Sequence, residues 1–332
     1  MIPSKSTISD VARHASVSTA TVSRVLNGGI CSENTKKRVL KAVESLGYNI
    51  NLDGKALRSG KTNRIFLSLA NISNPFYTTL AESIEASLSV RGYHILLSAS
   101  ADTEDAIHEQ IEKAATGIAD GFIFGPIEYS KSTIEKLRNL RIPTVILGPP
   151  VPGTKLDSVG TSEYYGLKES IMQLKAAGKK NFLLFNGPSN TIPGKSRNQY
   201  FSKVFSTLDD PSISFSIYNA SAFTYEQAHS ELETFKALKK FDAIICGNDL
   251  MAAAALNLLQ DNGVKIPEQV AVVGIDNDNF CDYLNPRLSS IDLMVPSMGH
   301  VAAQFLLDRL ENPNKAVSKH VSKSEFVPRQ TT

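Results

Sequence analysis

Apolar residues recur at helical spacing near the start of the chain. The first stripe of this kind consists of Ile8, Val11, Ala12 and Ala15, which predicts a short amphipathic helix. Thr7 stands directly before the stripe and Asp10 lies three residues further on. We therefore expect the helix to begin with a capping box that uses a shorter acid than usual.

Two more helices are expected in the same fifty residues. After a break at residues 15–17, Ser18 is placed as the N-cap of a second helix. Its inward face is formed by Val22, Val25 and Leu26, and it ends at residues 27–29. The third helix, about 32–46, is expected to bury Val39, Leu40, Val43 and Leu46. Three short helices on one small core, the second opening with small hydroxyl residues, favour a helix-turn-helix head that approaches DNA.

From residue 65 onward, short apolar runs alternate with helical patterns. The runs typical of strands are 65–70, 95–99, 121–124, 144–147, 182–185, 215–218, 243–246 and 270–274. Helical patterns lie between them, for example at 76–91 and 251–262. Such alternation predicts parallel sheets flanked by helices. The pattern restarts near residues 157–161, as though a second, similar unit began there.

Composition narrows the class of protein. Of 332 residues, 42% are apolar and 20% charged, which excludes a disordered tail, a collagen and a coiled-coil rod. No apolar run approaches the ~18 to 20 residues of a membrane span, and the N-terminus has no apolar stretch that would direct export. We therefore expect a cytoplasmic protein. The three cysteines and six histidines show no metal-ligand spacing, so neither a metal nor another cofactor is expected.

The charge is unevenly distributed along the chain. Residues 1–64 contain eleven Lys and Arg against four Asp and Glu, a net charge of +7, whereas the remainder carries −5. A basic head on a mildly acidic body favours contact between the head and a polyanion. The alternative at this point is a solvated basic face without a partner.

Specific motifs then point to one family. Residues 7–28 read TISDVARHASVSTATVSRVLNG, which resembles, nearly end to end, the DNA-binding signature of the lactose-repressor (LacI/GalR) family of bacterial transcription regulators. The body matches at NISNPFY (71–77), DGFIFG (120–125), CGNDLMAAAAL (246–256), VAVVGIDN (270–277) and NPRLSSIDL (285–293). The resemblance implies an all-α N-terminal helix-turn-helix head plus an α/β body of two doubly wound parallel-sheet lobes, as in type I periplasmic binding proteins.

The resemblance also implies a domain plan. Residues 1–48 would form the DNA-binding domain, 49–63 a hinge, and 64–332 the effector-binding and dimerisation domain. Within the body, one lobe would comprise about 64–159 and 291–320, the other about 161–289 and 322–332. The three crossovers between lobes are expected near Gly160, Ser290 and Val321.

Roles in DNA recognition follow from the same resemblance. Thr19 and Ala20 occupy positions that select the operator sequence, and Arg24 a third base-contacting position, where an arginine forks onto guanine. The other expected DNA-binding residues of the head are Thr7, Ser18, Thr21, Ser23 and Asn27. Because Thr19 and Ala20 present methyl groups, we expect contacts with thymine methyls at these bases.

The segment 49–63 resembles the hinge of the family, which orders into a short helix only when two chains lie side by side on operator DNA. Leu57 is at the position that wedges into a minor-groove base step, and Lys55 and Arg58 are placed to neutralise phosphates. Gly54 stands where alanine is common, and glycine inside a helix costs about 1 kcal/mol. This hinge is therefore expected to order less readily. Without the resemblance, the segment would be interpreted as a flexible tether.

Candidate effector-binding groups follow the strands of the body, because open parallel sheets bind ligands at the carboxyl ends of their strands. Arg197 and Asp276 align with the effector-binding arginine and the cleft aspartate of the family. The remaining candidates are Asn74, Phe76, Tyr77, Phe223, Asn248 and Asp249. Alternatively, Asp249 only caps its helix and Tyr77 is a core residue. Thr161 replaces an aspartate common in sugar-sensing members, which weakly favours an anionic effector.

The function predicted from these observations is that of a sequence-specific DNA-binding repressor of carbohydrate utilisation. A homodimer would bind a near-palindromic double-stranded operator, and a small sugar or sugar derivative in the cleft would change its affinity for DNA. A purine-like corepressor is the alternative. A transport-associated sugar-binding protein would not need the basic head. An enzyme is disfavoured because GxGxxG, P-loop, HExxH and GxSxG motifs are missing.

Overall fold

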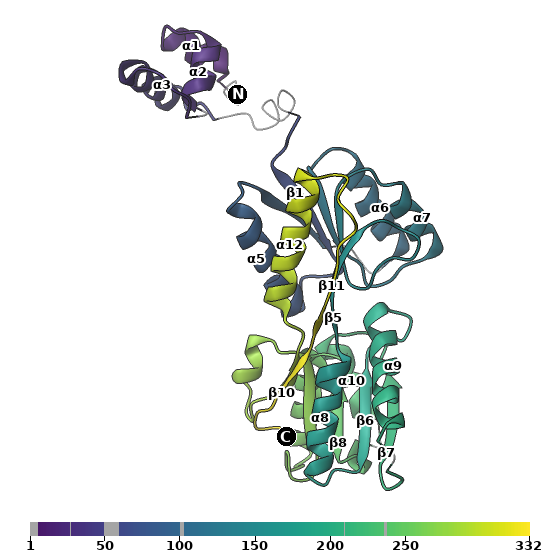
Figure 1. Ribbon diagram of the computed structural model, residues 1–332. Helices are drawn as coiled ribbons and strands as arrows, with labels where there is room; N and C mark the ends of the chain where they lie inside the picture. Colours follow the sequence, from purple (N-terminus) through teal and green to yellow (C-terminus); the bar gives the residue numbers. More distant parts are fainter. Residues whose placement is uncertain (1–5, 27, 50–59, 100–102, 209, 236–237) are drawn as a thin grey trace. The chain divides into compact units, whose positions relative to one another are not determined.

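The chain forms two compact units, Met1–Thr62 and Asn63–Thr332. The computed structural model, drawn in Figure 1, describes residues 6–26, 28–49, 60–99, 103–208, 210–235 and 238–332. The first unit contains α1 (Ile8–His14), α2 (Thr19–Leu26) and α3 (Glu33–Ser45). Thr7 and Asp10 form both hydrogen bonds of the expected capping box at the start of α1. The core of this head consists of Val11, Ala12, Ala15, Val22, Val25, Val39 and Ala42.

The prediction that Leu40 is buried in this core is wrong. Its side chain is 47% exposed, whereas Ala42 is buried. The inward face of α3 follows Val39, Ala42, Val43 and Leu46. Residue 40 lies about 100° further around the helix than Val39, because an α-helix has 3.6 residues per turn.

The turn between α1 and α2 is closed by a Schellman motif. The amide of Val17 donates to Ala12 O (3.0 Å) and that of Ser16 to Arg13 O (3.2 Å). Ser16 therefore has a left-handed backbone, with φ of 48°, at a place where glycine is the usual residue. Arg38 of α3 donates to the carbonyl of Ala15 (2.5 Å) and to that of Ser16 (2.9 Å). The guanidinium thus fixes the turn that aims α2.

The second unit contains two six-stranded sheets, each in its own lobe. The sheet of lobe 1 has the order β11-β5-β4-β3-β1-β2, and all its strands are parallel. Its strands are β1 (Arg64–Leu69), β2 (His94–Ala99), β3 (Gly121–Gly125), β4 (Thr144–Leu147), β5 (Asp157–Ser162) and β11 (Lys319–Lys323). Its helices are α5 (Pro75–Ser89), α6 (Glu104–Ala115), α7 (Lys131–Asn139) and α12 (Val295–Glu311).

The sheet of lobe 2 has the order β12-β10-β9-β8-β6-β7. Its strands are β6 (Asn181–Asn186), β7 (Ser214–Asn219), β8 (Ala243–Cys246), β9 (Ala271–Asp276), β10 (Ser289–Asp292) and β12 (Glu325–Val327). Its helices are α8 (Tyr164–Ala176), α9 (Ile192–Ser206), α10 (Tyr225–Thr234) and α11 (Asp249–Asp261), with short 3-10 turns at Leu238–Lys240 and Asn279–Asp282. β12 runs antiparallel to β10, while the other pairs are parallel. The predicted fold class, a helical head on a doubly wound α/β body, is confirmed.

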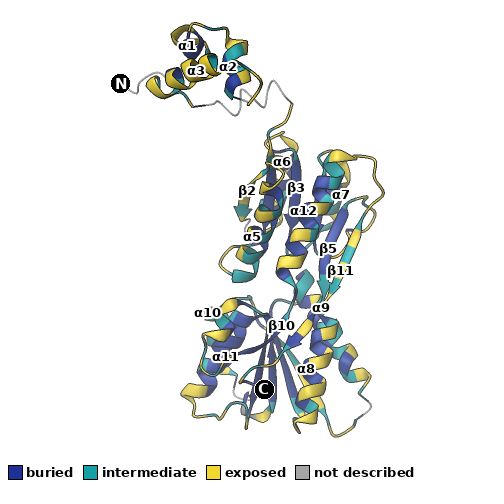
Figure 2. Ribbon diagram, turned by 60° about the vertical axis from the view of Figure 1, so that its left-hand side comes forward, coloured by how far each residue is buried: buried dark blue, intermediate teal, exposed yellow. Residues whose placement is uncertain are grey.

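Helices cover both faces of each sheet, so the central strands are buried (Figure 2). In lobe 1, α6 and α7 cover one face, where Phe66, Phe122 and Phe124 stack. The other face is covered by α5 and α12. These two helices approach closely at Gly299, where a β-carbon would lie 1.8 Å from Ser83 Oγ. In the part of the chain that the structure describes, no helix is long and apolar enough to cross a membrane.

Three connections join the lobes, each a few residues beyond the expected position. β5 runs through Ser162, β10 through Asp292 and β11 through Lys323, so Gly160 and Val321 pair within the sheet of lobe 1 and Ser290 within that of lobe 2.

The three connections are hydrogen-bonded to one another. Thr161 Oγ1 donates to Leu293 O (2.6 Å), and Ser324 Oγ donates to Ser162 O (2.9 Å). Ser324 Oγ also accepts a hydrogen bond from the amide of Gly166 (2.9 Å).

Candidate functional site

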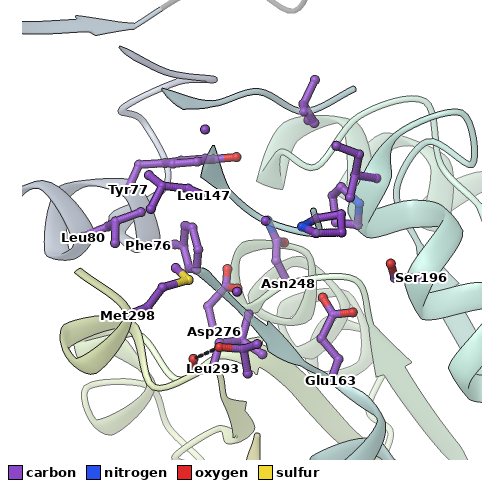
Figure 3. Close-up of a pocket in the computed structure, with 18 of the residues that line it drawn as sticks. Phe76, Tyr77, Leu80, Leu147, Glu163, Ser196, Asn248, Asp276, Leu293 and Met298 are labelled. Atoms are coloured by element: carbon purple, nitrogen blue, oxygen red, sulfur yellow. Dashed lines mark hydrogen bonds between the residues drawn. The ribbon is translucent and has the colours of Figure 1, made fainter. Parts of the chain in front are cut away.

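A cavity of about 320 Å³ lies between the two lobes, at the carboxyl ends of their strands. Side chains from both lobes converge on it (Figure 3). The loop after β1 contributes Asn74, the loop after β8 contributes Asn248, and β9 ends at Asp276. Strand ends are the expected ligand position in sheets of this type, so the fold itself places these groups together.

Asn74 links the two lobes across the cavity. Its Oδ1 accepts a hydrogen bond from the amide of Phe76 (3.0 Å) and so caps α5. Its Nδ2 therefore faces away from the helix and donates to Asp276 Oδ2 in lobe 2 (3.2 Å). A second interlobe hydrogen bond runs from the amide of Ile192, at the start of α9, to Ile127 O (2.8 Å). Both pairs line the cavity, so the lobes are bridged at two points.

Aromatic rings form an apolar part of the cavity wall. Phe76 and Tyr77 meet edge to face with their centroids 5.0 Å apart, and both line the cavity. Tyr200 and Phe223 contribute two more rings from lobe 2. Leu147, Leu293 and Met298 add aliphatic surface. Rings arranged this way can pack against the C–H face of a sugar or against a planar base.

Arg197 is the one basic residue among the described residues that line the cavity. It lies on α9 and is only 5% exposed. Its Nε donates to Glu163 Oε1 (3.0 Å) and its Nη1 to Gly247 O. The guanidinium carbon lies 5.4 Å from the centroid of the Phe223 ring. The position of Arg197 is thus fixed by an ion pair, a carbonyl and a ring.

Glu163 is a residue of the cavity that the sequence analysis missed. It directly follows β5 and is buried, and its carboxylate does not cap α8. Burial raises the pKa of Glu163, and the charge of Arg197 opposes that shift. Its position at the carboxyl end of β5 is the signal that could have identified it, since ligands of parallel sheets bind at strand ends.

Asp276 is the second carboxylate of the cavity. It ends β9 with a φ of 119°, a backbone conformation that residues other than glycine rarely adopt. Burial raises the pKa of Asp276 well above its usual range, the charge of Arg197 lowers it, and Asp249 and Asp278 raise it further. A carboxyl group held in this way can accept hydrogen bonds from the hydroxyl groups of a ligand.

The structure separates the neighbours Asn248 and Asp249. Asn248 lines the cavity, donates to Phe223 O (3.0 Å) and caps α11 through the amide of Met251 (2.9 Å). Asp249 is not among the residues that line the cavity. It is fully buried and accepts hydrogen bonds from Ser290 Oγ (2.6 Å), the amide of Asp278 (2.8 Å) and Cys281 Sγ (3.2 Å). Its expected contact with an effector is thus not supported, and the N-cap of α11 is Asn248.

In the head, α2 presents one exposed face. Thr19, Ala20 and Arg24 are exposed on it, while Val22 and Val25 are buried on the opposite side. Ser18 Oγ caps α2 by accepting from the amide of Thr21 (3.1 Å).

The other head positions named from the sequence differ in exposure. Thr7 is exposed at the start of α1, and Ser23 is half-buried. Asn27, Lys55, Leu57 and Arg58 lie outside the described residues.

Both units of the chain are similar to domains of known bacterial proteins. Residues 7–51 match the family model "Bacterial regulatory proteins, lacI family", and residues 171–332 match "Periplasmic binding protein-like domain". The chain is 28% identical to the transcriptional regulator RegA of Clostridium saccharobutylicum, with 98% of each chain covered. It is also 28% identical to the ribose operon repressor of Bacillus subtilis, again with 98% of each chain covered.

Among solved structures, the lac repressor dimer bound to operator and the anti-inducer ONPF is similar in fold. The TM-score is 0.86 at 20% identity, over 99% of each chain.

Proposed function

Because the chain belongs to the LacI family of bacterial regulatory proteins, we propose that it is a homodimeric repressor of carbohydrate-utilisation genes. Each protomer inserts α2 into the major groove of one operator half-site. A small sugar or sugar derivative in the interlobe cavity changes the affinity of the dimer for DNA. The protein acts in the cytoplasm and is not an enzyme.

One observation carries this proposal. The same chain holds an exposed recognition face on α2 and a cavity whose lining comes from two lobes. A ligand that contacts Asn74 on one lobe and Asp276 on the other changes the free energy of lobe closure. Lobe closure is in turn coupled to DNA binding. The factor by which the ligand changes the affinity for DNA therefore equals the factor by which DNA changes the affinity for the ligand.

The residues proposed to contact DNA divide into two groups. Thr19, Ala20 and Arg24 contact bases. The other DNA contacts are assigned to Thr7, Ser18, Thr21, Ser23, Asn27, Lys55, Leu57 and Arg58. The residues proposed to bind the effector are Asn74, Phe76, Tyr77, Arg197, Phe223, Asn248 and Asp276, to which we add Glu163.

The experiment that tests this function is a pull-down of genomic fragments by the full chain at fixed physiological salt, followed by sequencing. Salt must be fixed because phosphate contacts make affinity depend steeply on ionic strength. We expect a few enriched palindromes near genes of sugar metabolism. Anisotropy titrations on those sites with candidate sugars then identify the effector. Uniform recovery of fragments with and without a metabolite extract would refute a sequence-specific regulator.

Replacement of Arg24 by alanine tests the recognition helix. We expect operator affinity to fall by about 1–3 kcal/mol and discrimination to relax at one base pair, because arginine forks onto guanine. A matched control is Arg141→Ala, which removes an exposed arginine from the body and should change nothing. Equal weakening across all operator variants would instead identify Arg24 as a phosphate contact.

A further inference from the structure

We propose that Glu163 makes the cavity selective for uncharged, hydroxylated ligands and against anionic ones, because it already neutralises Arg197. The excluded class comprises uronates, aldonates and sugar phosphates. This inference rests on the proposed function in one respect, since it takes the interlobe cavity as the effector site.

The ion pair engages part of the guanidinium and places a carboxylate directly against its charge. Both side chains are largely buried, with exposures of 6% for Arg197 and 10% for Glu163. Of the five N–H donors of a guanidinium, two are engaged by Glu163 and Gly247. The donors that are left suit hydroxyl or ring oxygens of a ligand. A carboxylate would have to compete for Arg197 with a partner that is already desolvated and aligned.

The charge balance of the lining argues in the same direction. The described lining holds two carboxyl groups, of Glu163 and Asp276, and one arginine. Burial raises the pKa of both carboxyl groups, which means that negative charge is unfavourable at this place in the protein. A ligand anion would add to that charge in a site with little water to screen it. A polyol instead donates hydrogen bonds from its hydroxyl groups to the two carboxyl groups and accepts hydrogen bonds from Arg197.

Thr161 does not alter this balance. Its hydroxyl is engaged with Leu293 O (2.6 Å), and Glu163 supplies a carboxylate two positions further along the chain. The expectation of a less acidic cavity, and with it the preference for an anionic effector, is therefore replaced by the opposite preference. The four rings and the aliphatic side chains complete a site for a ligand with hydroxyl edges and an apolar face.

Calorimetry on the full chain with matched sugar pairs tests the inference. The pairs are D-galactose with D-galacturonate, D-glucose with D-glucuronate, and D-ribose with D-ribonate. For every pair in which the neutral sugar binds the wild type, we expect its acid to bind at least about tenfold more weakly, which corresponds to 1.4 kcal/mol. In Glu163→Gln, affinity for the acid should rise about tenfold or more. Glu233→Gln, which changes an exposed glutamate of α10 in the same lobe, is the matched control and should behave as wild type.

A second arm uses acetate and inorganic phosphate as probes, compared with chloride at equal ionic strength. We expect these anions to raise the melting temperature of Glu163→Gln but not that of wild type or of the control. If no sugar binds any variant while this stabilisation appears, the sugar effector is wrong and the role of Glu163 stands. Wild type binding an acid as tightly as its neutral partner overturns the inference, whether or not Glu163→Gln folds. A folded Glu163→Gln that gains affinity for no anion overturns it as well.

Discussion

Asp278 combines a buried carboxylate with incomplete hydrogen bonding. Within the described chain its Oδ2 is buried and receives no hydrogen bond. Burial, together with the nearby charge of Asp249, raises the pKa of Asp278 to about 7. Burial also raises the pKa of Asp249 to about 6. These groups lie beneath the cavity edge formed by Asp276 and oppose its ionisation.

Replacement of Asp278 by asparagine should stabilise the protein at alkaline pH. Since the folded-state pKa is raised above the unfolded value of about 4, the contribution of this group to stability is full below pH 4 and is lost as pH rises through 7. We expect Asp278→Asn to increase the free energy of unfolding by roughly 1–3 kcal/mol at pH 8 and by little at pH 4.5. Urea unfolding at the two pH values measures this, with the exposed Asp261→Asn as control. If Asp278→Asn changed the free energy of unfolding equally at pH 4.5 and pH 8, the raised pKa of Asp278 would be contradicted.

At this scale, sequence reasoning located most of the cavity but not its charge balance. Asn74 could be predicted because it follows a strand, a local signal, whereas Arg197 and Asp276 were predicted from the family resemblance. Glu163 also follows a strand, but its pairing with Arg197 has no local signal, since the two residues are 34 positions apart and meet only through packing. Nor does a strand end reveal which of two adjacent residues, Asn248 or Asp249, faces the cavity.

Among the elements, the crossing of α5 and α12 tolerates almost no added volume. A β-carbon at Gly299 would lie 1.8 Å from Ser83 Oγ and 3.1 Å from Leu80 O. Gly299→Ala should therefore destabilise lobe 1 by about 1–3 kcal/mol, the usual cost of overpacking. Ser83→Ala removes the hydroxyl that clashes but keeps Ser83 Cβ, 3.0 Å from the added carbon, so the double variant should recover part of the loss. Additive losses in this cycle, measured by denaturant unfolding, would show that the two positions are independent.

Element positions were predictable because their signals are local. Apolar spacing and capping residues gave α1 to α3 and most strands within a few residues. Leu40 marks where this prediction fails. From the sequence alone, an apolar residue next to the buried face of a helix cannot be distinguished from one that belongs to that face. The left-handed Ser16 was also out of reach, because the residue carries no glycine signal and its conformation is fixed by the distant Arg38.

For the whole molecule, the interlobe hydrogen bond between Asn74 and Asp276 determines how closure of the lobes depends on charge. Asn74→Asp keeps the oxygen that caps α5 but replaces the donor facing Asp276 by a second carboxyl oxygen. At pH 8 we expect like-charge repulsion to separate the lobes, to increase the radius of gyration in X-ray scattering, and to lower effector affinity about tenfold. Affinity falls because binding must then supply the free energy of closure.

The control for this variant is Asn74→Ser, which retains a capping side chain without adding charge. It should lower effector affinity less, and its pH dependence between pH 5 and 8 should match that of wild type. In Asn74→Asp the effect should shrink as pH falls from 8 to 5, because protonation of either carboxyl group removes the repulsion. Equal behaviour of the two variants at pH 8 would mean that the Asn74–Asp276 contact does not hold the lobes.

The global arrangement was predictable because alternation of strands and helices leaves few topologies for a parallel sheet. The antiparallel β12 was not predictable, since a three-residue strand has too little pattern of its own and is defined only by its pairing with β10.

The hydroxyl groups of Thr161 and Ser324 bind the three interlobe connections to one another. Connections joined in this way cannot bend independently, and two rigid bodies that share one axis keep a single angle of relative rotation. Any ligand that touches both lobes must act on that one angle. Ligands of different shape should then give the same two geometries in different proportions, so that partial effectors change how often the closed form occurs and not what it looks like.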